Sequence, residues 1–195
     1  MQHWRGSAPT RRISCTGLTL FVFWSTVAWA EPGPDEIIEL SRKMVALRRA
    51  GNHGEALTVG QKTLQLSEQA LGPEHPTVAI YLDHLGTLYR ILGGDAKAEP
   101  LFLRALAIRE KALGPEHPAL ASSLTHLATL YRDEHRYAEA EPLFQRAVAL
   151  REKQEGPTNP SLAKLLERYA DLLQATNRAG DAARLRARAA AIGRQ

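Results

Sequence analysis

Cysteine is almost absent from this 195-residue chain, whose one thiol is that of Cys15 near the N-terminus. The rest of the chain therefore has no disulfide, no thiol nucleophile and no cysteine-based metal site. The sequence also lacks a GxSxG motif, a P-loop, a GxGxxG motif and an HExxH pair. These absences argue against an enzyme, and we expect no catalytic residues, no metal and no cofactor.

Acidic residues are absent from residues 1–30, which carry Arg5, Arg11 and Arg12 ahead of the apolar run GLTLFVFWSTVAWA. The run has 14 residues, fewer than the roughly 20 that a membrane-spanning helix needs. It ends in Ala-Trp-Ala, a small-x-small pattern typical of signal-peptide cleavage. We therefore predict a signal peptide cleaved after Ala30, rather than an uncleaved anchor. The mature protein would be periplasmic or secreted, without stable membrane insertion.

Neither sign of charge dominates once this leader is removed. The whole chain has a formal net charge of +4, but residues 31–195 carry 22 basic and 21 acidic residues. Residues 160–195 hold 7 basic and 3 acidic side chains. Such a segment fits either a patch for nucleic acid or an anionic membrane, or a solvated capping helix that ends an array. We expect the cap, and no nucleic-acid partner.

What the chain does have is an internal repeat. LGPEHP stands at residues 71–76 and again at 113–118, and the 42-residue segments that start there share 26 identical positions. The same register reaches GPTNP at residues 156–160. A fixed period of this length indicates a solenoid or a propeller. Because the period is rich in Ala, Leu, Arg and Glu, it favours helices over the strands of a propeller.

Each period has room for two amphipathic helices. In the first helix of one copy, apolar residues follow one another at helical spacing, at Leu120, Leu124, Leu127 and Tyr131. Gly114 suits a helix C-cap and Pro118 a first helical position, so the hexapeptide is predicted to be the corner between two helices. Pro100 and Pro142 lie inside the second helices, where each should remove a backbone hydrogen bond and bend the helix.

The spacing inside the period resembles the tetratricopeptide repeat (TPR) pattern, with Leu-Gly and Tyr in the first helix and Ala-x3-Phe in the second. One copy has this pattern at Leu82, Leu85, Gly86, Tyr89, Ala98 and Phe102. The next has it at Leu124, Leu127, Ala128, Tyr131, Ala140 and Phe144. The small residues of the pattern let paired helices approach closely. The last copy is weaker, with Arg186 where Phe is expected. The long period and YAEAEPLFQRAVALREK resemble the kinesin-light-chain type of TPR.

We therefore predict an all-α fold, a right-handed α-solenoid of antiparallel helix pairs with a 42-residue period and about three to four TPR units. The predicted divisions are a cleaved signal peptide at 1–30, a short linker and degenerate helix pair at 31–70, TPR units at 71–112 and 113–154, and degenerate C-terminal capping helices at 155–195. The resemblance specifies a fold well and a function poorly.

The resemblance also implies that the first helix of each pair lines a concave face where partners bind. Subtracting the packed positions of these helices leaves a largely polar stripe, formed by Ile80, Asp83, Thr87, Arg90, Ser122, Thr125, Thr129, Arg132, Lys164, Glu167, Asp171 and Gln174. The stripe varies between copies while the packed positions repeat. That contrast predicts a partner-binding surface, and a solvated groove without a partner is the alternative.

Taken together, these features predict a non-enzymatic interaction module in the cell envelope that binds a peptide or protein segment in its concave groove. The rival hypothesis is a structural role, in which the array associates with itself or joins an envelope complex without a peptide ligand. Kinesin-light-chain-type repeats often carry an Asn in the first helix that contacts a bound peptide, and this chain departs from that pattern.

Two histidines, His84 and His126, stand one period apart, near the positions where kinesin-light-chain-type repeats carry that Asn. They serve either as hydrogen-bonding groups for a partner or as part of the helix interface, and their repetition favours the interface. Equivalent positions in neighbouring repeats lie about 10 Å apart, so the two rings are not expected to share a metal ion.

Overall fold

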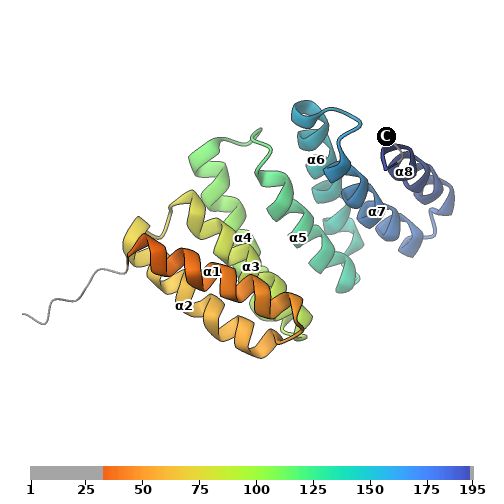
Figure 1. Ribbon diagram of the computed structural model, residues 1–195. Helices are drawn as coiled ribbons and strands as arrows, with labels where there is room; N and C mark the ends of the chain where they lie inside the picture. Colours follow the sequence, from red (N-terminus) through yellow and green to blue (C-terminus); the bar gives the residue numbers. More distant parts are fainter. Residues whose placement is uncertain (1–32, 194–195) are drawn as a thin grey trace, which may run out of the picture. The chain divides into compact units, whose positions relative to one another are not determined.

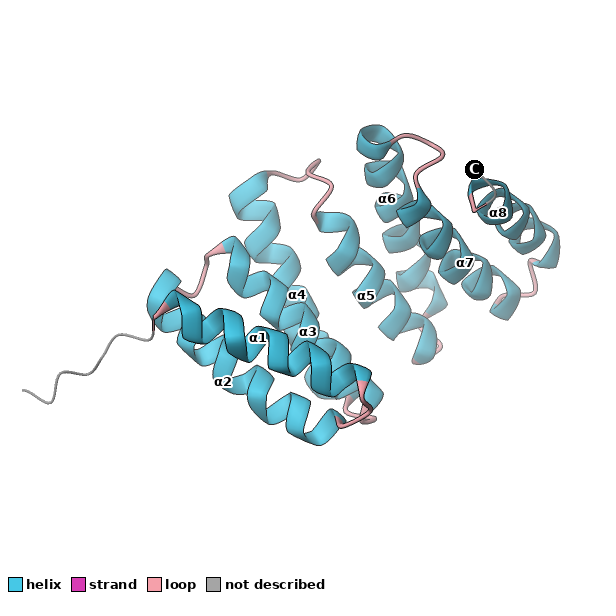
Figure 2. Cartoon of the chain, in the orientation of Figure 1, coloured by secondary structure: helices cyan, strands magenta, loops and turns pink. Residues whose placement is uncertain are grey.

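The computed structural model describes residues 33–193, so the predicted signal peptide at 1–30 lies outside the described part of the chain. Within residues 33–193 the chain is all helical, without a strand (Figures 1 and 2). The helices follow one another as α1 (Pro34–Arg49), α2 (His53–Leu71), α3 (Pro76–Ile91), α4 (Asp95–Leu113), α5 (Leu120–Asp133), α6 (Tyr137–Glu155), α7 (Pro160–Ala175) and α8 (Ala179–Ile192). None of these helices combines the length and the apolar character that a membrane crossing requires.

Helices pack in pairs, and the pairs stack in chain order. Each first helix packs against its own second helix, as α3 does against α4, and each second helix packs against the first helix of the next pair. This is the arrangement of an α-solenoid, in which every repeat contacts its neighbours only. The predicted all-α solenoid of helix pairs is therefore confirmed.

A glycine ends the second helix of each of the first three pairs. Gly72, Gly114 and Gly156 have φ values of 87°, 85° and 83°, with ψ values of 150°, 161° and 164°. This backbone region is open essentially to glycine alone. The N–H of each glycine donates to the carbonyl oxygen of a glutamate four residues earlier, which closes the helix end. The predicted C-cap at Gly114 is confirmed.

The next helix begins within a few residues of that glycine. Pro76 and Pro160 are first residues of α3 and α7, as expected for proline, whose missing N–H needs no partner there. Pro118 departs from this pattern, because α5 begins two residues later at Leu120. The ring of His117 nevertheless accepts a hydrogen bond from the N–H of Ala119, at 3.2 Å. The first helical position predicted for Pro118 is thus wrong by two residues.

The residues before Pro76 and Pro160 cap the helices that follow. His75 Nδ1 accepts from the N–H of Thr77 at 3.2 Å, and Asn159 Oδ1 accepts from the N–H of Ser161 at 2.8 Å. His75 has the extended backbone expected before proline, with ψ of 138°. His75 and Asn159 therefore have a structural role as N-caps, each satisfying one of the unpaired N–H groups at the helix start.

Small and large residues face each other within a pair. A Cβ atom on Gly86 would stand 2.5 Å from Phe102 Cε1, so glycine permits the close approach of α3 and α4. In the first pair the sizes are exchanged, with Met44 one period before Gly86 and Gly60 one period before Phe102. A Cβ on Gly60 would stand 2.9 Å from Met44 Sδ. The degenerate pair thus packs a small residue against a large one at the same crossing, with the two sizes exchanged between its helices.

Pro100 and Pro142 lie in the second turn of α4 and α6, and both helices continue through them to Leu113 and Glu155. Both proline side chains are exposed. The outward placement keeps each ring away from the neighbouring helices. The bend expected at these positions stays a prediction.

Recurring glutamates join successive pairs through ion pairs on the second helices. The guanidinium groups of Arg104, Arg146 and Arg188 lie 2.6, 2.7 and 2.5 Å from the carboxylates of Glu68, Glu110 and Glu152. A second series links Arg136 to Glu99 at 3.0 Å and Arg178 to Glu141 at 2.6 Å. Each such pair contributes little by itself, because solvent screens the attraction between exposed charges. The periodic carboxylates therefore serve stacking, and their repetition reflects architecture.

First helices also contact one another across the stack. α3 packs directly against α5, and α5 against α7, and these approaches are closer than those between successive second helices. We call the face formed by the first helices α3, α5 and α7 the inner wall. It carries the stripe that the sequence predicts as a binding surface.

Candidate partner-binding surface

The structure places the twelve predicted residues on the inner wall with unequal exposure. Five are exposed, namely Ile80, Lys164, Glu167, Asp171 and Gln174. Five are half-buried, namely Thr87, Arg90, Ser122, Thr125 and Arg132. Asp83 and Thr129 are each only 4% exposed. All four stripe residues of α7 are therefore exposed, against one on α3 and none on α5, and the prediction that all twelve face outward is wrong for Asp83 and Thr129.

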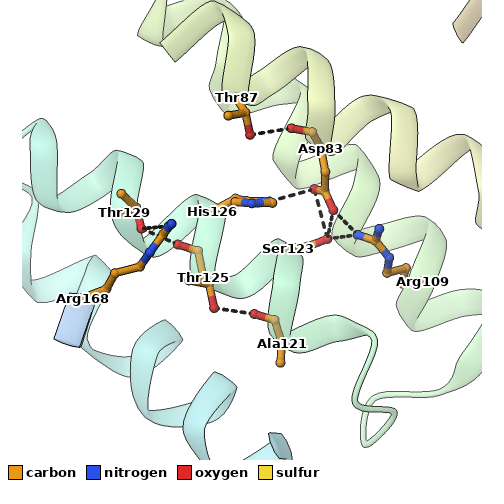
Figure 3. A network of polar contacts seen from close by, with 9 residues as sticks. All are labelled: Asp83, Thr87, Arg109, Ala121, Ser123, Thr125, His126, Thr129 and Arg168. Carbon is orange, nitrogen blue, oxygen red and sulfur yellow. Dashed lines mark hydrogen bonds and ion pairs between the residues drawn. The ribbon is translucent and has the colours of Figure 1, made fainter. Parts of the chain in front are cut away.

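Asp83 is buried because three neighbours converge on its carboxylate (Figure 3). Arg109, on α4, donates from Nη1 to Asp83 Oδ2 at 2.5 Å and also to the hydroxyl of Ser123. The Ser123 hydroxyl lies 3.2 Å from both carboxylate oxygens of Asp83. Arg109 and Ser123 are themselves buried. The cluster therefore joins α3, α4 and α5 by a satisfied, charge-assisted network, and Asp83 has a structural role.

His126 completes this cluster from the inner wall. Its Nδ1 lies 3.6 Å from Asp83 Oδ1, beyond hydrogen-bond distance, and its ring stacks on Phe102 with centroids 5.3 Å apart. Burial raises the pKa of the Asp83 carboxyl, but His126 and Arg109 lower it by more, so its pKa lies below the ordinary value of 3.8. Asp83 is therefore charged throughout the neutral range.

His84 occupies the equivalent position one period earlier, and its surroundings differ. Burial lowers the pKa of His84 below 6.5, and the positive charge of Arg48 lowers it further, so the ring is neutral at pH 7. Among residues 33–193, no group of three or more His, Asp or Glu side chains gathers as metal ligands. The ring stacking of His126 supports the interpretation of these histidines as parts of the helix interface.

Threonines of the inner wall turn their hydroxyl groups back to their own helices. Thr87 donates to the carbonyl of Asp83 at 2.8 Å, and Thr129 donates to that of Thr125 at 2.7 Å. Thr125 in turn donates to the carbonyl of Ala121 at 2.5 Å (Figure 3). These hydroxyl protons are used within the fold. The threonine oxygens can still accept, as Thr129 does from Arg168 at 3.5 Å.

The arginines of the predicted stripe are paired with acids of neighbouring helices. Arg90, on α3, lies 2.8 Å from the carboxylate of Asp133 on α5. Arg132 lies 2.7 Å from Asp133 and 3.6 Å from Asp171, which belongs to α7. The Arg90–Asp133 and Arg132–Asp171 pairs run from one first helix to the next, whereas the Arg132–Asp133 pair lies within α5. Arg90 and Arg132 thus contribute to the cohesion of the wall as well as to its charge.

An open cleft of about 480 Å³ lies between α5 and α7, over the end of α6. It is lined by Ser122, Thr125, His126, Arg151, Pro160, Ser161, Lys164, Leu165 and Arg168. The lining includes three of the predicted binding residues. It holds three Lys or Arg side chains and one His, and no acid. The cleft therefore combines a size suited to a ligand group with positive charge.

Sequence reasoning missed Arg109 and Arg151 as parts of polar sites. Both follow the apolar stripe of their helix at helical spacing, as the sequence Ala98, Phe102, Ala105, Arg109 illustrates. A charged residue at a buried position of a helix needs a partner, so the position of these arginines in the sequence could have predicted a polar site. Arg168 was missed as well, and its place in the cleft follows from the packing of α7 against α5.

Comparison with known proteins agrees with this architecture. The sequence profile described as Tetratricopeptide repeat matches residues 44–111, 94–153 and 120–195, which together span most of the chain. No curated protein matches the sequence significantly. Members of this family are typically non-enzymatic and generally bind protein partners, and the fold suggests a protein-interaction scaffold.

Several solved structures have a similar fold. BtubC (BKLC) from P. vanneervenii superposes with a TM-score of 0.72 at 23% identity, over 82% of this chain and 64% of that protein. The chain thus spans less than two thirds of the length of BtubC. A Podosopora anserina putative kinesin light chain with nearly identical TPR-like repeats gives a TM-score of 0.65 at 25% identity, over 84% of this chain and 77% of that one.

A further similar structure is that of MamA from Desulfovibrio magneticus RS-1, with a TM-score of 0.58 at 19% identity, over 85% of this chain and 80% of that one. The similarities to BtubC and MamA concern the fold alone. The profile match and the stacked helix pairs show that the chain belongs to the tetratricopeptide repeat family, and its structure is similar to those of kinesin-light-chain-like members.

Proposed function

We propose that this protein is a non-enzymatic interaction module that binds an extended segment of a partner protein along its inner wall. The observation that carries the proposal is the contrast between buried and exposed positions of the first helices. Leu82, Leu124 and Leu166 repeat at one buried position, whereas Ile80, Ser122 and Lys164 differ at one position of the stripe. Variation at positions of the stripe, beside packed positions that repeat, is what a surface adapted to a partner requires.

The exposure of the stripe residues refines where the partner binds. On α3 the polar stripe residues have partners within the fold, since Asp83 belongs to the buried cluster and Arg90 pairs with Asp133, while the stripe residues of α7 are exposed. The open cleft lies between α5 and α7. The C-terminal half of the inner wall is therefore the main binding region in this proposal.

A peptide display experiment tests the binding site. Selection against the purified protein should yield peptides whose affinity falls at least tenfold in an Arg168→Glu variant, because reversing a charge in the site replaces attraction by repulsion. Arg184→Glu is the matched control, since the Arg184 side chain is 82% exposed on α8 and outside the cleft lining. Peptides that bind both variants and the parent equally would rule out this part of the wall.

We also propose that the mature protein acts outside the cytoplasm, after removal of residues 1–30. The basic, acid-free start and the short apolar run that ends in Ala-Trp-Ala support this. A phosphatase that is active only in an oxidising compartment, fused to the C-terminus, should be active in cells. N-terminal sequencing of the purified protein should begin at Glu31. An inactive fusion together with an intact N-terminus would contradict export.

A further inference from the structure

The outer helices α1 and α8 stand at the two ends of the stack formed by residues 33–193 (Figure 1). Inside the stack, each second helix packs against the first helix of the next pair. A second copy of the chain would continue the stack if its α1 packed on α8 in the same way. The three inner junctions show which positions would then meet, because the repeat register carries over to α1 and α8.

Each inner junction has a contact at its centre between one position of the second helix and two adjacent positions of the next first helix. The ring of Phe102, on α4, stacks on that of His126, on α5, with centroids 5.3 Å apart. The ring of Phe144, on α6, stacks on that of Tyr169, on α7, with centroids 5.7 Å apart. Tyr169 stands one residue after the position equivalent to His126. The two contacts thus place the phenylalanine position against this pair of neighbouring positions.

The first junction has the same register with smaller side chains. Gly60, on α2, takes the phenylalanine position, and Leu85, on α3, takes the position of Tyr169. A Cβ atom on Gly60 would stand 2.9 Å from Leu85 Cδ2, so the same positions meet here. At all three inner junctions the second helix therefore contributes an uncharged residue, and no two cations meet at the centre.

The outer faces of α1 and α8 have cations at all of these positions. Arg186 takes the phenylalanine position on α8, and Arg42 and Lys43 take the two facing positions on α1. Arg186 lies 3.1 Å from Asp171, an acid of its own helix pair, and is still 46% exposed. Arg42 and Lys43 are exposed, and the one ion pair of α1 within residues 33–193 is made by Glu36. Stacking α1 of one copy on α8 of another would bring three cations together.

The acid on the same face of α1 would have no cation opposite it. Glu39 takes the register position of Ser123, whose hydroxyl accepts a hydrogen bond from Arg109 at the second junction. The position of Arg109 is taken by Gly193 on α8. A stacked copy would therefore place Glu39 against a glycine, and the repulsion at the centre would not be offset by a new ion pair.

The ion pairs that join successive second helices would also be lost at such a junction. Inside the stack a glutamate of one second helix pairs with an arginine of the next, as Glu110 does with Arg146 at 2.7 Å. Residue 194 lies outside the described range, but in sequence register Arg194 takes the fourth glutamate position and Lys62 the first arginine position. Two copies in register would therefore have two cations in place of an attractive pair.

We infer that the outer faces of α1 and α8 repel each other through these matched cations, which prevents copies of the chain from continuing one another's helix stack. Polarity alone would not have this effect, because faces of opposite charge attract each other. A head-to-tail contact between copies joins two different surfaces, so it grows into an open chain unless it closes into a ring. The charge barrier therefore keeps the helix pairs of one chain from becoming part of a longer array.

Charge reversal on one face tests the inference. Arg42→Glu/Lys43→Glu gives α1 two acids that face Arg186, so this variant should associate head to tail about tenfold or more strongly than the parent. Light scattering over a dilution series should show a mass that rises with concentration for the variant and stays constant for the parent. Lys97→Glu/Arg184→Glu is the matched control, because it makes the same change in net charge at exposed residues away from both faces.

Reversal on the other face separates the charge pairing from other causes. Arg186→Glu alone should also promote association, which keeps the inference testable if the first variant does not fold by circular dichroism. Combining it with Arg42→Glu/Lys43→Glu makes both faces acidic and should abolish the association. Salt at about 1 M, where the Debye length is about 3 Å, should weaken the association of both single-face variants.

Three results would overturn the inference. The first is a folded Arg42→Glu/Lys43→Glu variant with the same constant mass as the parent. The second is equal association of the Lys97→Glu/Arg184→Glu control, since net charge would then explain the effect. The third is a parent protein that itself forms growing chains. The binding of partner segments to the inner wall does not enter any of these measurements.

Discussion

Removing the carboxylate of Asp83 should be among the most destabilising single changes in this protein. In Asp83→Ala the Arg109 guanidinium stays buried without its acid, and the hydroxyl of Ser123 loses an acceptor. Breaking a buried ion pair in this way costs about 3–5 kcal/mol. For a domain of this size each kcal/mol lowers the melting temperature by about 2–4 °C, so a decrease of roughly 6–20 °C is expected.

Thermal unfolding followed by circular dichroism measures this change, and two further variants interpret it. Glu116→Ala removes an acid whose side chain is 70% exposed and pairs only with Lys153, so it should cost about 1 kcal/mol or less. The double variant Asp83→Ala/Arg109→Met removes both buried charges and should be more stable than Asp83→Ala alone. Equal melting temperatures for Asp83→Ala and Glu116→Ala would refute the role assigned to the cluster.

The same pair predicts a pH dependence with a definite sign. The pKa of Asp83 is lowered in the folded protein relative to 3.8, so the charged form stabilises the fold at every pH above that value. The stability difference between the parent and Asp83→Ala should stay constant from neutral pH down to about pH 5, and shrink as the pH falls below 3.8 through the folded-state pKa. A difference that grows on acidification would contradict this assignment.

Three other substitutions, one of them with a matched control, test the repeat architecture by thermal or urea unfolding. Gly114→Ala should cost about 1–3 kcal/mol because its φ of 85° and ψ of 161° suit glycine alone, whereas Gly180→Ala, in open space within α8, should be neutral or stabilising. His75→Asn should stabilise by up to about 1 kcal/mol, since asparagine is a better N-cap and stands at the equivalent position of the last copy. Glu110→Gln should cost about 1 kcal/mol or less, because its pair with Arg146 is partly exposed.

Much of the fold could be predicted because the sequence repeats itself. Two copies with 26 identical positions in 42 reveal the period, the corner and the small residues at the helix crossing. The degenerate first pair shows the limit of the motif, since Met44 and Gly60 pack with sizes opposite to those of Gly86 and Phe102. Its structure follows from volume, which a residue pattern does not encode.

The binding stripe was predicted less well, since helical spacing gives direction but not exposure. Asp83, Thr125 and Glu167 occupy one register position in successive copies. In the structure the first is buried, the second half-buried and the third exposed. The difference arises from residues distant in sequence, above all Arg109, which reaches Asp83 from α4.

By itself, the sequence determined the 42-residue period, the helical content, the glycine ends of the helices and the family to which the chain belongs. These properties depend on local backbone preferences and on apolar spacing, which each copy carries within itself. Only the tertiary structure decided that Arg109 has a carboxylate from the inner wall while Arg151 stands beside an open, positively charged cleft. Charge pairing depends on which side chains of neighbouring repeats meet in the fold. A buried charge is costly without a partner, whereas a charge exposed to water needs none.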